Sequence, residues 1–333
     1  MTNKITLHHG DGGVKTNALI NEVFLKYYGA NMDVSLSDAF IFDVKTSKLA
    51  YTTDSFVVQP LFFRGGDIGK LAVCGTLNDL ATAGAKPYYL SASFMIEEGF
   101  DIDVLCKIAQ SMGDVCKENG VKIVTGDTKV VEKGSVDGLF INTSGIGVVA
   151  ESFAPSKIEP EDEIIITGTI AEHGTAILLD RYDLEIETNI TSDCCALSHL
   201  ITDLDKVLPY IKLMKDPTRG GVATVLNEIA TNVGYNVELI ENRIPMNPQI
   251  KAINDILGID PFYLACEGRM ILVVKNGFGK RVLQKLRKLR GYENAQSIGR
   301  FTNDYQKTVY LKTSIGGKRV MPSLEGQMVP RIC

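Results

Sequence analysis

The sequence lacks the features of a membrane or exported protein. None of its apolar runs reaches the roughly 18 residues that a membrane-spanning helix needs. The polar, histidine-containing stretch from Met1 to Gly10 does not have the pattern of a signal peptide. We therefore expect no membrane partner.

Positive charge is not in excess either. The chain carries 35 lysines and arginines against 40 aspartates and glutamates, and its formal net charge is −5. Such a balance gives no general attraction to phosphate backbones. Nucleic acid is therefore not an expected partner.

A disulfide framework is also missing. Seven cysteines are an odd number, and several lie in apolar stretches, as Cys74 does. Unpaired thiols predict a reducing compartment, so we expect a cytoplasmic protein. The group Cys194, Cys195 and His199 matches no standard zinc-binding spacing. His173, alone in its segment, is interpreted as a hydrogen-bonded structural residue.

The patterns that are present alternate between strands and helices. A length of 333 residues predicts about two domains of roughly 150 residues each, and a polar connector with prolines over 151–161 predicts the boundary. The expected class is α/β (α+β). Strands are expected at 39–43, 49–58, 88–96, 121–124, 138–149 (interrupted at 142–145), 163–167, 236–241 and 269–274. Helices are expected around Leu19 to Tyr27, from Ile68 and over 101–118, 222–231, 247–257 and 280–290.

Acidic residues recur at strand ends or in a helix rich in small residues. They are Asp54, Asp79, Asp127 and Asp216. Carboxylate oxygens are hard ligands that suit magnesium. Aspartates that only form turns are the structural alternative.

Glycine-rich loops lie near these acids. The loop His8-His9-Gly10-Asp11-Gly12-Gly13 has successive N–H groups that can bind an anion. The motif Asp216-Pro217-Thr218-Arg219-Gly220-Gly221 precedes a helix whose N-terminus attracts phosphate. Arg219 favours this interpretation over an ordinary turn and cap. Acids and loops together predict Mg-ATP binding, although Walker A and protein-kinase signatures are absent.

The last residue of the sequence is a cysteine, Cys333, after a segment that mixes glycine, proline and charge. Such a segment can stay mobile, and thirteen extended residues reach roughly 40 Å. It can therefore bring the thiol into a cleft. A frayed terminus that happens to end in cysteine is the alternative.

These motifs resemble the HypE family of NiFe hydrogenase maturation proteins. The family shares its acidic and glycine motifs with aminoimidazole ribonucleotide synthetase, selenophosphate synthetase and thiamine monophosphate kinase, which lack the cysteine tail. Asp11 and Cys266 depart from the expected pattern, where a smaller residue and Asn are expected. The motifs that carry the resemblance are His9-Gly10-Asp11-Gly12-Gly13, Thr53-Asp54-Ser55, Gly69 to Asp79, Gly126-Asp127-Thr128-Lys129-Val130-Val131, Asp216 to Val222 and Pro330-Arg331-Ile332-Cys333.

The resemblance implies a two-domain PurM-like fold and a homodimer joined through the N-terminal sheets. It implies a Gly-rich loop and helix over 1–38 and an ATP-binding and dimerisation domain over 39–152. A C-terminal α/β domain over 153–315 and a mobile tail over 316–333 with the reactive cysteine complete the expected division.

The resemblance also implies a reaction. A HypF-type carbamoyltransferase loads a carbamoyl group onto the sulfur of Cys333, and the protein uses ATP and Mg²⁺ to dehydrate it to a thiocyanate. The cyano group then passes to the iron of a HypC–HypD complex.

The implied roles of single residues follow the same motifs. Catalytic roles fall to Cys333, Glu267 as general base and Lys129 as the group that neutralises a phosphate or the activated oxygen. The expected magnesium ligands are Asp54, Asp79, Asp127 and Asp216. Nucleotide binding is expected at Gly10, Gly12, Gly13, Asn78, Thr143, Thr218, Arg219, Gly220 and Gly221.

Two rival interpretations remain. One is an ATP-dependent enzyme of the same superfamily that acts on a small molecule, such as a ribonucleotide cyclo-ligase. The other is a non-catalytic scaffold whose tail docks partners.

Overall fold

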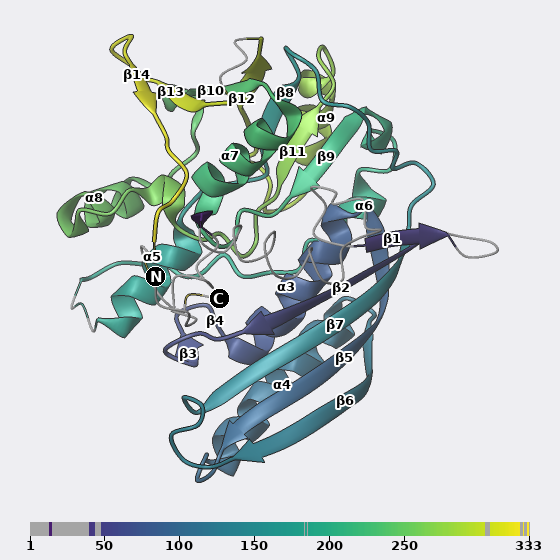
Figure 1. Cartoon of the computed structure of the whole chain (residues 1–333), viewed down its shortest axis with the longest axis vertical. Coiled ribbons are helices and arrows are strands. Elements are labelled where there is room, and N and C mark those ends of the chain that lie inside the picture. Colours follow the sequence, from purple (N-terminus) through teal and green to yellow (C-terminus); the bar gives the residue numbers. More distant parts are fainter. Residues whose placement is uncertain are drawn as a thin grey trace, which may run out of the picture.

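A computed structural model describes residues 13–14, 40–43, 48–182, 184, 186–303, 307–326, 329 and 332. The predictions for Gly10, Gly12 and Cys333, and for a helix around Leu19 to Tyr27, lie outside the described residues. Two α/β units follow one another along the chain, each built on a mixed sheet (Figure 1). The predicted two-domain α/β class is therefore confirmed.

The N-terminal sheet has its strands in the order β1-β2-β7-β5-β6. Helices α3 and α4 cover one of its faces (Figure 1). A two-stranded ribbon, β3 (Phe62–Phe63) with β4 (Gly66–Asp67), precedes the first of these helices. The strands are β1 (Phe40–Asp43), β2 (Lys48–Phe56), β5 (Ala85–Glu97), β6 (Lys122–Val131) and β7 (Leu139–Val149), and the helices are α3 (Ile68–Thr82) and α4 (Ile102–Glu118).

Helix α3 begins where Asp67 caps it, since Oδ1 of Asp67 accepts hydrogen bonds from the N–H groups of Gly69 and Lys70. Almost every residue of α3 is buried. A Cβ atom at Gly75 would lie 2.7 Å from the ring of Phe56, so the helix can approach β2 only because this position has no side chain. The small-residue face read from the sequence therefore lets α3 pack closely on the sheet.

The C-terminal sheet has the strand order β14-β13-β10-β12-β8-β11-β9. Only β10 and β13 pair in parallel among its described strands. The strands are β8 (Glu163–Ile166), β9 (Ile211–Lys215), β10 (Asn236–Ile240), β11 (Ile271–Val274), β12 (Gln296–Thr302), β13 (Val309–Lys312) and β14 (Lys318–Val320). The helices are α5 (Glu172–Arg181), α6 (Leu200–Asp203), α7 (Gly221–Val233), α8 (Pro248–Leu257) and α9 (Gly279–Leu286), with 3-10 turns η3 (Leu208–Tyr210), η4 (Glu241–Arg243) and η5 (Pro261–Tyr263).

Two strands of the N-terminal sheet differ from the sequence prediction. Strand β6 does not end at Val124 but continues to Val131, because 125–131 pair with β5. Strand β7 is not interrupted at 142–145, since these residues pair with β2 on one side and β5 on the other. Ladder hydrogen bonds on both sides outweigh the weak strand propensity of Asn and Gly.

The segment expected to be a mobile tail begins as structure. Strand β14 pairs with β13 and so belongs to the C-terminal sheet. The chain after β14 then runs back toward α5 (Figure 1). Within the described ranges, no helix has the length and apolar character to cross a membrane.

Candidate active site

An acidic cavity lies where α3 and β2 meet the loops of the C-terminal half. Its volume is about 30 Å³. Its walls come from β2, from α3, from the loop between β9 and α7 and from the loop before β11. The lining residues are Asp54, Ser55, Phe56, Gly75, Asp79, Asp216, Thr218, Arg219 and Glu267. Six residues predicted for the site therefore meet in one place.

Two of the acids belong to the N-terminal half. Residues of β2 alternate between its faces, and Thr52, Asp54 and Phe56 point toward α3. Asp79, on α3, accepts a hydrogen bond of 2.8 Å from the hydroxyl of Thr52. Strand period and helix position together direct Asp54 and Asp79 to the same cavity.

The loop after β9 supplies the third acid and the turn into α7. Asp216 is buried. Gly220 and Gly221 both have positive φ, at 72° and 60°. A Cβ atom on Gly221 would lie 2.5 Å from the carbonyl oxygen of Leu264, so the backbone can enter α7 here only with glycine.

Glu267 is the most deeply buried acid of the cavity, with 2% of its surface exposed. Its Oε1 has no hydrogen-bond partner among the described residues. Burial, and then the nearby Cys194, Asp216, Asp193 and Asp54, raise the pKa of this carboxyl well above its usual range. The cavity therefore holds a buried carboxyl group whose uncharged form is favoured.

The loop that carries Glu267 is fixed on two sides. The N–H of Glu267 donates to Oδ1 of Asp193 at 3.1 Å, and the carbonyl of Glu267 accepts from Nδ2 of Asn78 at 3.1 Å. Asn78 also donates to the carbonyl of Cys195 and accepts from the N–H of Leu197. The predicted nucleotide-binding residue Asn78 thus joins α3 to both loops of the C-terminal half.

The chemistry of the cavity suits magnesium. Asp54, Asp79 and Asp216 are hard oxygen donors, and the unpartnered Oε1 of Glu267 is a further oxygen in the same cavity that a cation would contact. In the part of the chain that the structure describes, no three His, Cys, Asp or Glu side chains are close enough to hold a metal by themselves. A magnesium ion here would need phosphate oxygens or water as further ligands.

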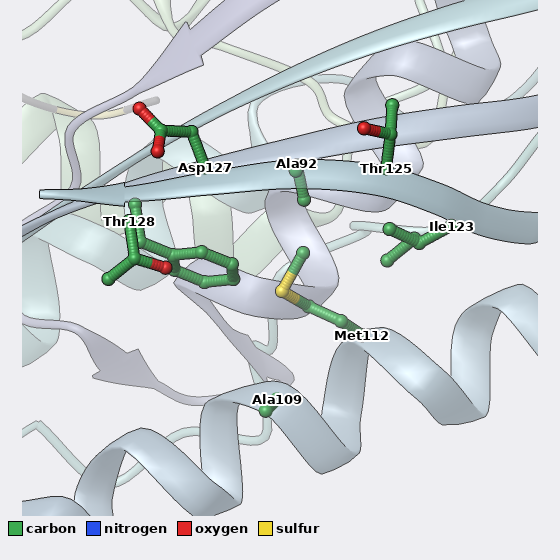
Figure 2. Close-up of a pocket in the computed structure, with 9 residues that line it drawn as sticks. Ala92, Ala109, Met112, Ile123, Thr125, Asp127 and Thr128 are labelled. Carbon is green, nitrogen blue, oxygen red and sulfur yellow. The ribbon is translucent and has the colours of Figure 1, made fainter.

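Asp127 and Lys129 are not brought to this cavity. Both are well exposed on β6, with their charged atoms 3.9 Å apart. Across the sheet, Asp54 is in register with Thr143, Ala92 and Gly126, so Asp127 is one residue out of that row and faces the opposite side. Figure 2 shows Asp127 and Thr125 pointing away from α4.

A separate pocket of about 540 Å³ lies on the other side of β6, between it and α4. Ile123 and Thr128 point into it from the strand, while Ala109 and Met112 face them from the helix (Figure 2). The prediction that Asp127 would join the other three acids as a magnesium ligand thus has no geometric support within one chain.

The remaining predicted residues have mixed positions. Thr143 is fully buried, and its hydroxyl donates to the carbonyl of Ala72 at 3.0 Å and contacts Thr76, so it serves the packing of α3 on β7. Gly13 is buried. His199 contacts the hydroxyl of Tyr292 at 3.0 Å.

Sequence reasoning missed Asp193. Its side chain is fully buried, and its two oxygens accept the N–H groups of Glu267 and Gly268. In the sequence, the neighbouring Cys194-Cys195 pair raises only the question of a metal cluster, which its spacing does not support, and so it does not indicate Asp193. A buried carboxylate that receives backbone N–H groups from a loop 74 residues away leaves no local signal in the sequence.

Comparison with known proteins agrees with this architecture. The family "AIR synthase related protein, N-terminal domain" matches residues 36–149, and its "C-terminal domain" matches 159–312. The carbamoyl dehydratase HypE of Rhodobacter capsulatus is 41% identical over 335 aligned residues, which cover 99% of this chain and 98% of the relative.

Solved structures give the same result. A HypE–HypF complex contains a chain with 43% identity and a TM-score of 0.86, covering 92% of this chain and 100% of that one. HypE in complex with ATP has 39% identity and a TM-score of 0.83, covering 99% and 100%. The chain therefore belongs to the AIR synthase related proteins and, among them, to the HypE carbamoyl dehydratase family.

Proposed function

We propose that this protein uses ATP to dehydrate an S-carbamoylated Cys333 to a thiocyanate, and so supplies the cyanide ligand for the iron of a NiFe hydrogenase. The observation that carries this proposal is the buried, unpartnered carboxyl of Glu267 in an acidic cavity, in a chain about 40% identical throughout to carbamoyl dehydratases. ATP fits the proposal because a relative of 39% identity was solved with ATP.

The reaction needs a leaving group and a base. The carbonyl oxygen of the thiocarbamate attacks the γ-phosphorus of ATP, the bond from that phosphorus to the bridging oxygen breaks, and ADP leaves. The phosphorylated oxygen then departs as phosphate while the amide nitrogen loses its two protons. The sulfur retains a nitrile carbon, and water has been removed in net terms.

Glu267 suits the role of the base. Burial raises the pKa of its carboxyl, which makes the carboxylate a stronger base for a weakly acidic N–H. Charge in the cavity must be balanced for that carboxylate to form. Asp54, Asp79 and Asp216 would hold magnesium, which supplies positive charge against the phosphates when bound.

Nucleotide positioning falls to the loop before α7. Thr218 and Arg219 line the cavity, and no side chain caps the start of α7, where the N–H groups of a helix N-terminus suit phosphate oxygens. Asp127 as a magnesium ligand and Lys129 as a phosphate-neutralising group stay predictions, since a single chain places both on the far face of the sheet.

A second copy of this chain is the partner that we propose for that far face. Strand β6 is exposed along nearly its whole length. The side chains of Tyr51 on β2 and of Tyr89 and Met95 on β5 are about half exposed in the same sheet. An edge strand beside exposed apolar residues favours strand-to-strand association, so we expect a homodimer in sedimentation.

Other partners follow from the reaction. A HypF-type transferase would load the carbamoyl group, as the solved HypE–HypF complex suggests, and a HypC–HypD complex would accept the cyano group. Six described cysteines are free thiols, among them the adjacent Cys194 and Cys195. Free thiols favour a reducing compartment, and we propose the cytoplasm.

Mass spectrometry of the C-terminal peptide tests the proposal. After incubation with carbamoyl phosphate, ATP and the transferase, the peptide should gain a carbamoyl group and then lose one water. A carbamoylated peptide that persists with Mg-ATP would overturn it. A small-molecule enzyme would keep its activity without Cys333, and a scaffold would show no rise in melting temperature with Mg-ATP.

A further inference from the structure

His173 is completely buried at the start of α5, and both nitrogens of its ring are engaged. Nδ1 lies 2.8 Å from Oγ of Ser192, and Nε2 lies 2.7 Å from the carbonyl oxygen of Ile332. A carbonyl can only accept, so Nε2 carries the hydrogen, and Nδ1 accepts from the hydroxyl of Ser192. The hydrogen bond to the carbonyl of Ile332 is therefore donated by Nε2–H of His173.

The ring is held neutral in this arrangement. Burial lowers the pKa of His173 to about 4, although the hydrogen bond to Ile332 acts in the opposite direction. The ring of Phe63 packs edge-on against the imidazole, with the two ring centroids 5.4 Å apart. Ser192 is oriented in turn, since its oxygen accepts the N–H of Cys194 at 3.0 Å.

The partner of His173 is the residue before Cys333. Ile332 is 7% exposed and Val329 8%, and both belong to the main hydrophobic core. Earlier carbonyls of the same segment are held too. Asn227 donates to Met321 at 2.9 Å, and Tyr263 donates to Pro322 at 2.8 Å.

This docking point is directly linked to the candidate base. Ser192 precedes Asp193, whose carboxylate accepts the N–H of Glu267 at 3.1 Å. A movement of the Ser192 segment would therefore also disturb the loop that carries Glu267.

Arg269 provides a second link between the start of α5 and the loop that carries Glu267. Glu172, the residue before His173, forms an ion pair with Arg269. Arg269 also lies 3.7 Å from Asp193. Glu172 and Asp193 thus flank the same guanidinium, so the start of α5 and the 267–269 loop form one connected polar unit.

We propose that His173, oriented by Ser192, is a positioning residue that captures the carbonyl of Ile332 and so sets where the chain's final sulfur meets the Glu267 cavity. The inference rests on the proposed function. A histidine needed only to fill the core could be satisfied by nearby groups of its own domain. This one is satisfied by a backbone carbonyl 159 residues away in the sequence.

The test compares His173→Ala, His173→Gln and the matched control His199→Gln in the full-length protein. Two quantities are measured: the rate at which iodoacetamide alkylates Cys333, from the mass of the C-terminal peptide, and single-turnover dehydration of the carbamoylated protein. In His173→Ala, alkylation should be about tenfold faster, the size of losing one hydrogen bond of about 1.4 kcal/mol.

Dehydration should fall by about 100-fold in His173→Ala, because misplaced reactants lose their proximity advantage, while the KM for ATP stays within about twofold of the wild type. Gln can still donate from a terminal N–H, so His173→Gln should recover part of both effects. The control His199→Gln should match the wild type, since the contacts described for the His199 ring are with Tyr292.

Equal alkylation and dehydration in His173→Ala and wild type would overturn the proposal. Ser192→Ala removes the orienting hydroxyl without emptying the core, so it replaces His173→Ala if that variant does not fold, and the same equality would count against the proposal. If wild type never dehydrates but the alkylation rates differ, the docking stands and the proposed function fails.

Discussion

The two faces of the N-terminal sheet place similar acidic side chains in different environments, one in a cavity and the other in solvent. On the face toward α3, Asp54 meets Asp79, Asp216 and Glu267 in one narrow cavity. On the other face, Asp127 lies on an exposed strand beside Lys129. All five carboxylates are predicted site residues, yet only four converge within one chain.

The difference comes from strand register. In β6, Ile123 pairs with Leu90, but Thr125 pairs with Ser91, so the register shifts by one residue between them. Figure 2 shows the result, with Ile123 pointing toward α4 and Thr125 away from it. Without this bulge, Asp127 would face the same side as Ile123. One inserted residue therefore separates the exposed acid from the buried group.

The largest effect is expected from neutralising Glu267, the buried carboxyl of the cavity. Glu267→Gln removes the base but keeps the side-chain shape, so we expect dehydration of the carbamoylated protein to fall by about 10²–10⁴-fold. Single-turnover mass spectrometry of the C-terminal peptide measures this. The Mg-ATP-dependent rise in melting temperature should persist, since the proposed magnesium ligands are intact.

Full dehydration by Glu267→Gln would show that another group takes the proton. The matched exposed control is Glu161→Gln, whose carboxylate pairs with Arg300 on the surface at 2.8 Å. That variant should dehydrate at the wild-type rate.

The variants Asp216→Asn and Asp127→Asn compare an acid in the cavity with an acid on the exposed face. Asp216 lies in the cavity, so its neutralisation should remove most of the magnesium-dependent shift in melting temperature that ATP causes. Asp127→Asn should leave the shift nearly unchanged in a monomer. Differential scanning fluorimetry with ATP, with and without magnesium, gives both values.

An equal loss in both variants would mean that the open face also reaches a nucleotide. Within one chain, Asp127 faces the side of the sheet opposite to the cavity that holds Asp216. A second copy of the chain would therefore have to supply Asp127 to the nucleotide. Dilution below the dimerisation constant would then remove the effect of Asp127→Asn but not that of Asp216→Asn.

Local patterns predicted the parts of the site that depend on one element. The alternation around Asp54, the small residues of α3 and the Pro and Gly pair of the 216–221 loop each fix a local geometry. Position relative to other elements was not predictable. The bulge in β6, the strand pairing of Thr143 and the clamp of Asp193 on Glu267 depend on contacts between distant segments.

His173 illustrates the same limit. The interpretation as a hydrogen-bonded structural residue was right about its bonds, since both ring nitrogens have partners. The identity of one partner, near the far end of the chain, has no trace in the residues around position 173. Long-range hydrogen bonds of buried polar groups follow from the completed fold.

The buried side also predicts a pH effect. Burial lowers the pKa of His173 from 6.5 to about 4, so between these values the unfolded chain binds a proton that the folded chain resists. Stability that is present above pH 6.5 is therefore lost as the pH falls toward 4, by about 3 kcal/mol in total. His173→Gln lacks the titrating imidazole and so lacks this pH-dependent loss of stability.

Urea unfolding of wild type and His173→Gln at a series of pH values measures the effect. The wild type should lose stability faster on acidification, by up to about 1.4 kcal/mol per pH unit. Parallel curves for the two proteins would contradict the burial of an uncharged imidazole.

The smallest effect compares the N-terminal caps of α3 and α4, the two helices on the same face of the N-terminal sheet. Asp67 accepts from two N–H groups at 2.7 and 3.1 Å at the start of α3, and Asp101 does so at 2.8 and 3.0 Å at the start of α4. The bonds are alike, but those of Asp67 are partly buried and those of Asp101 are exposed. Replacement by Ala should cost about 1–2 kcal/mol of unfolding free energy at Asp67 and about 0.5–1 at Asp101. Urea unfolding measures both, and a larger loss at Asp101 would show that burial does not set the cost of losing a cap.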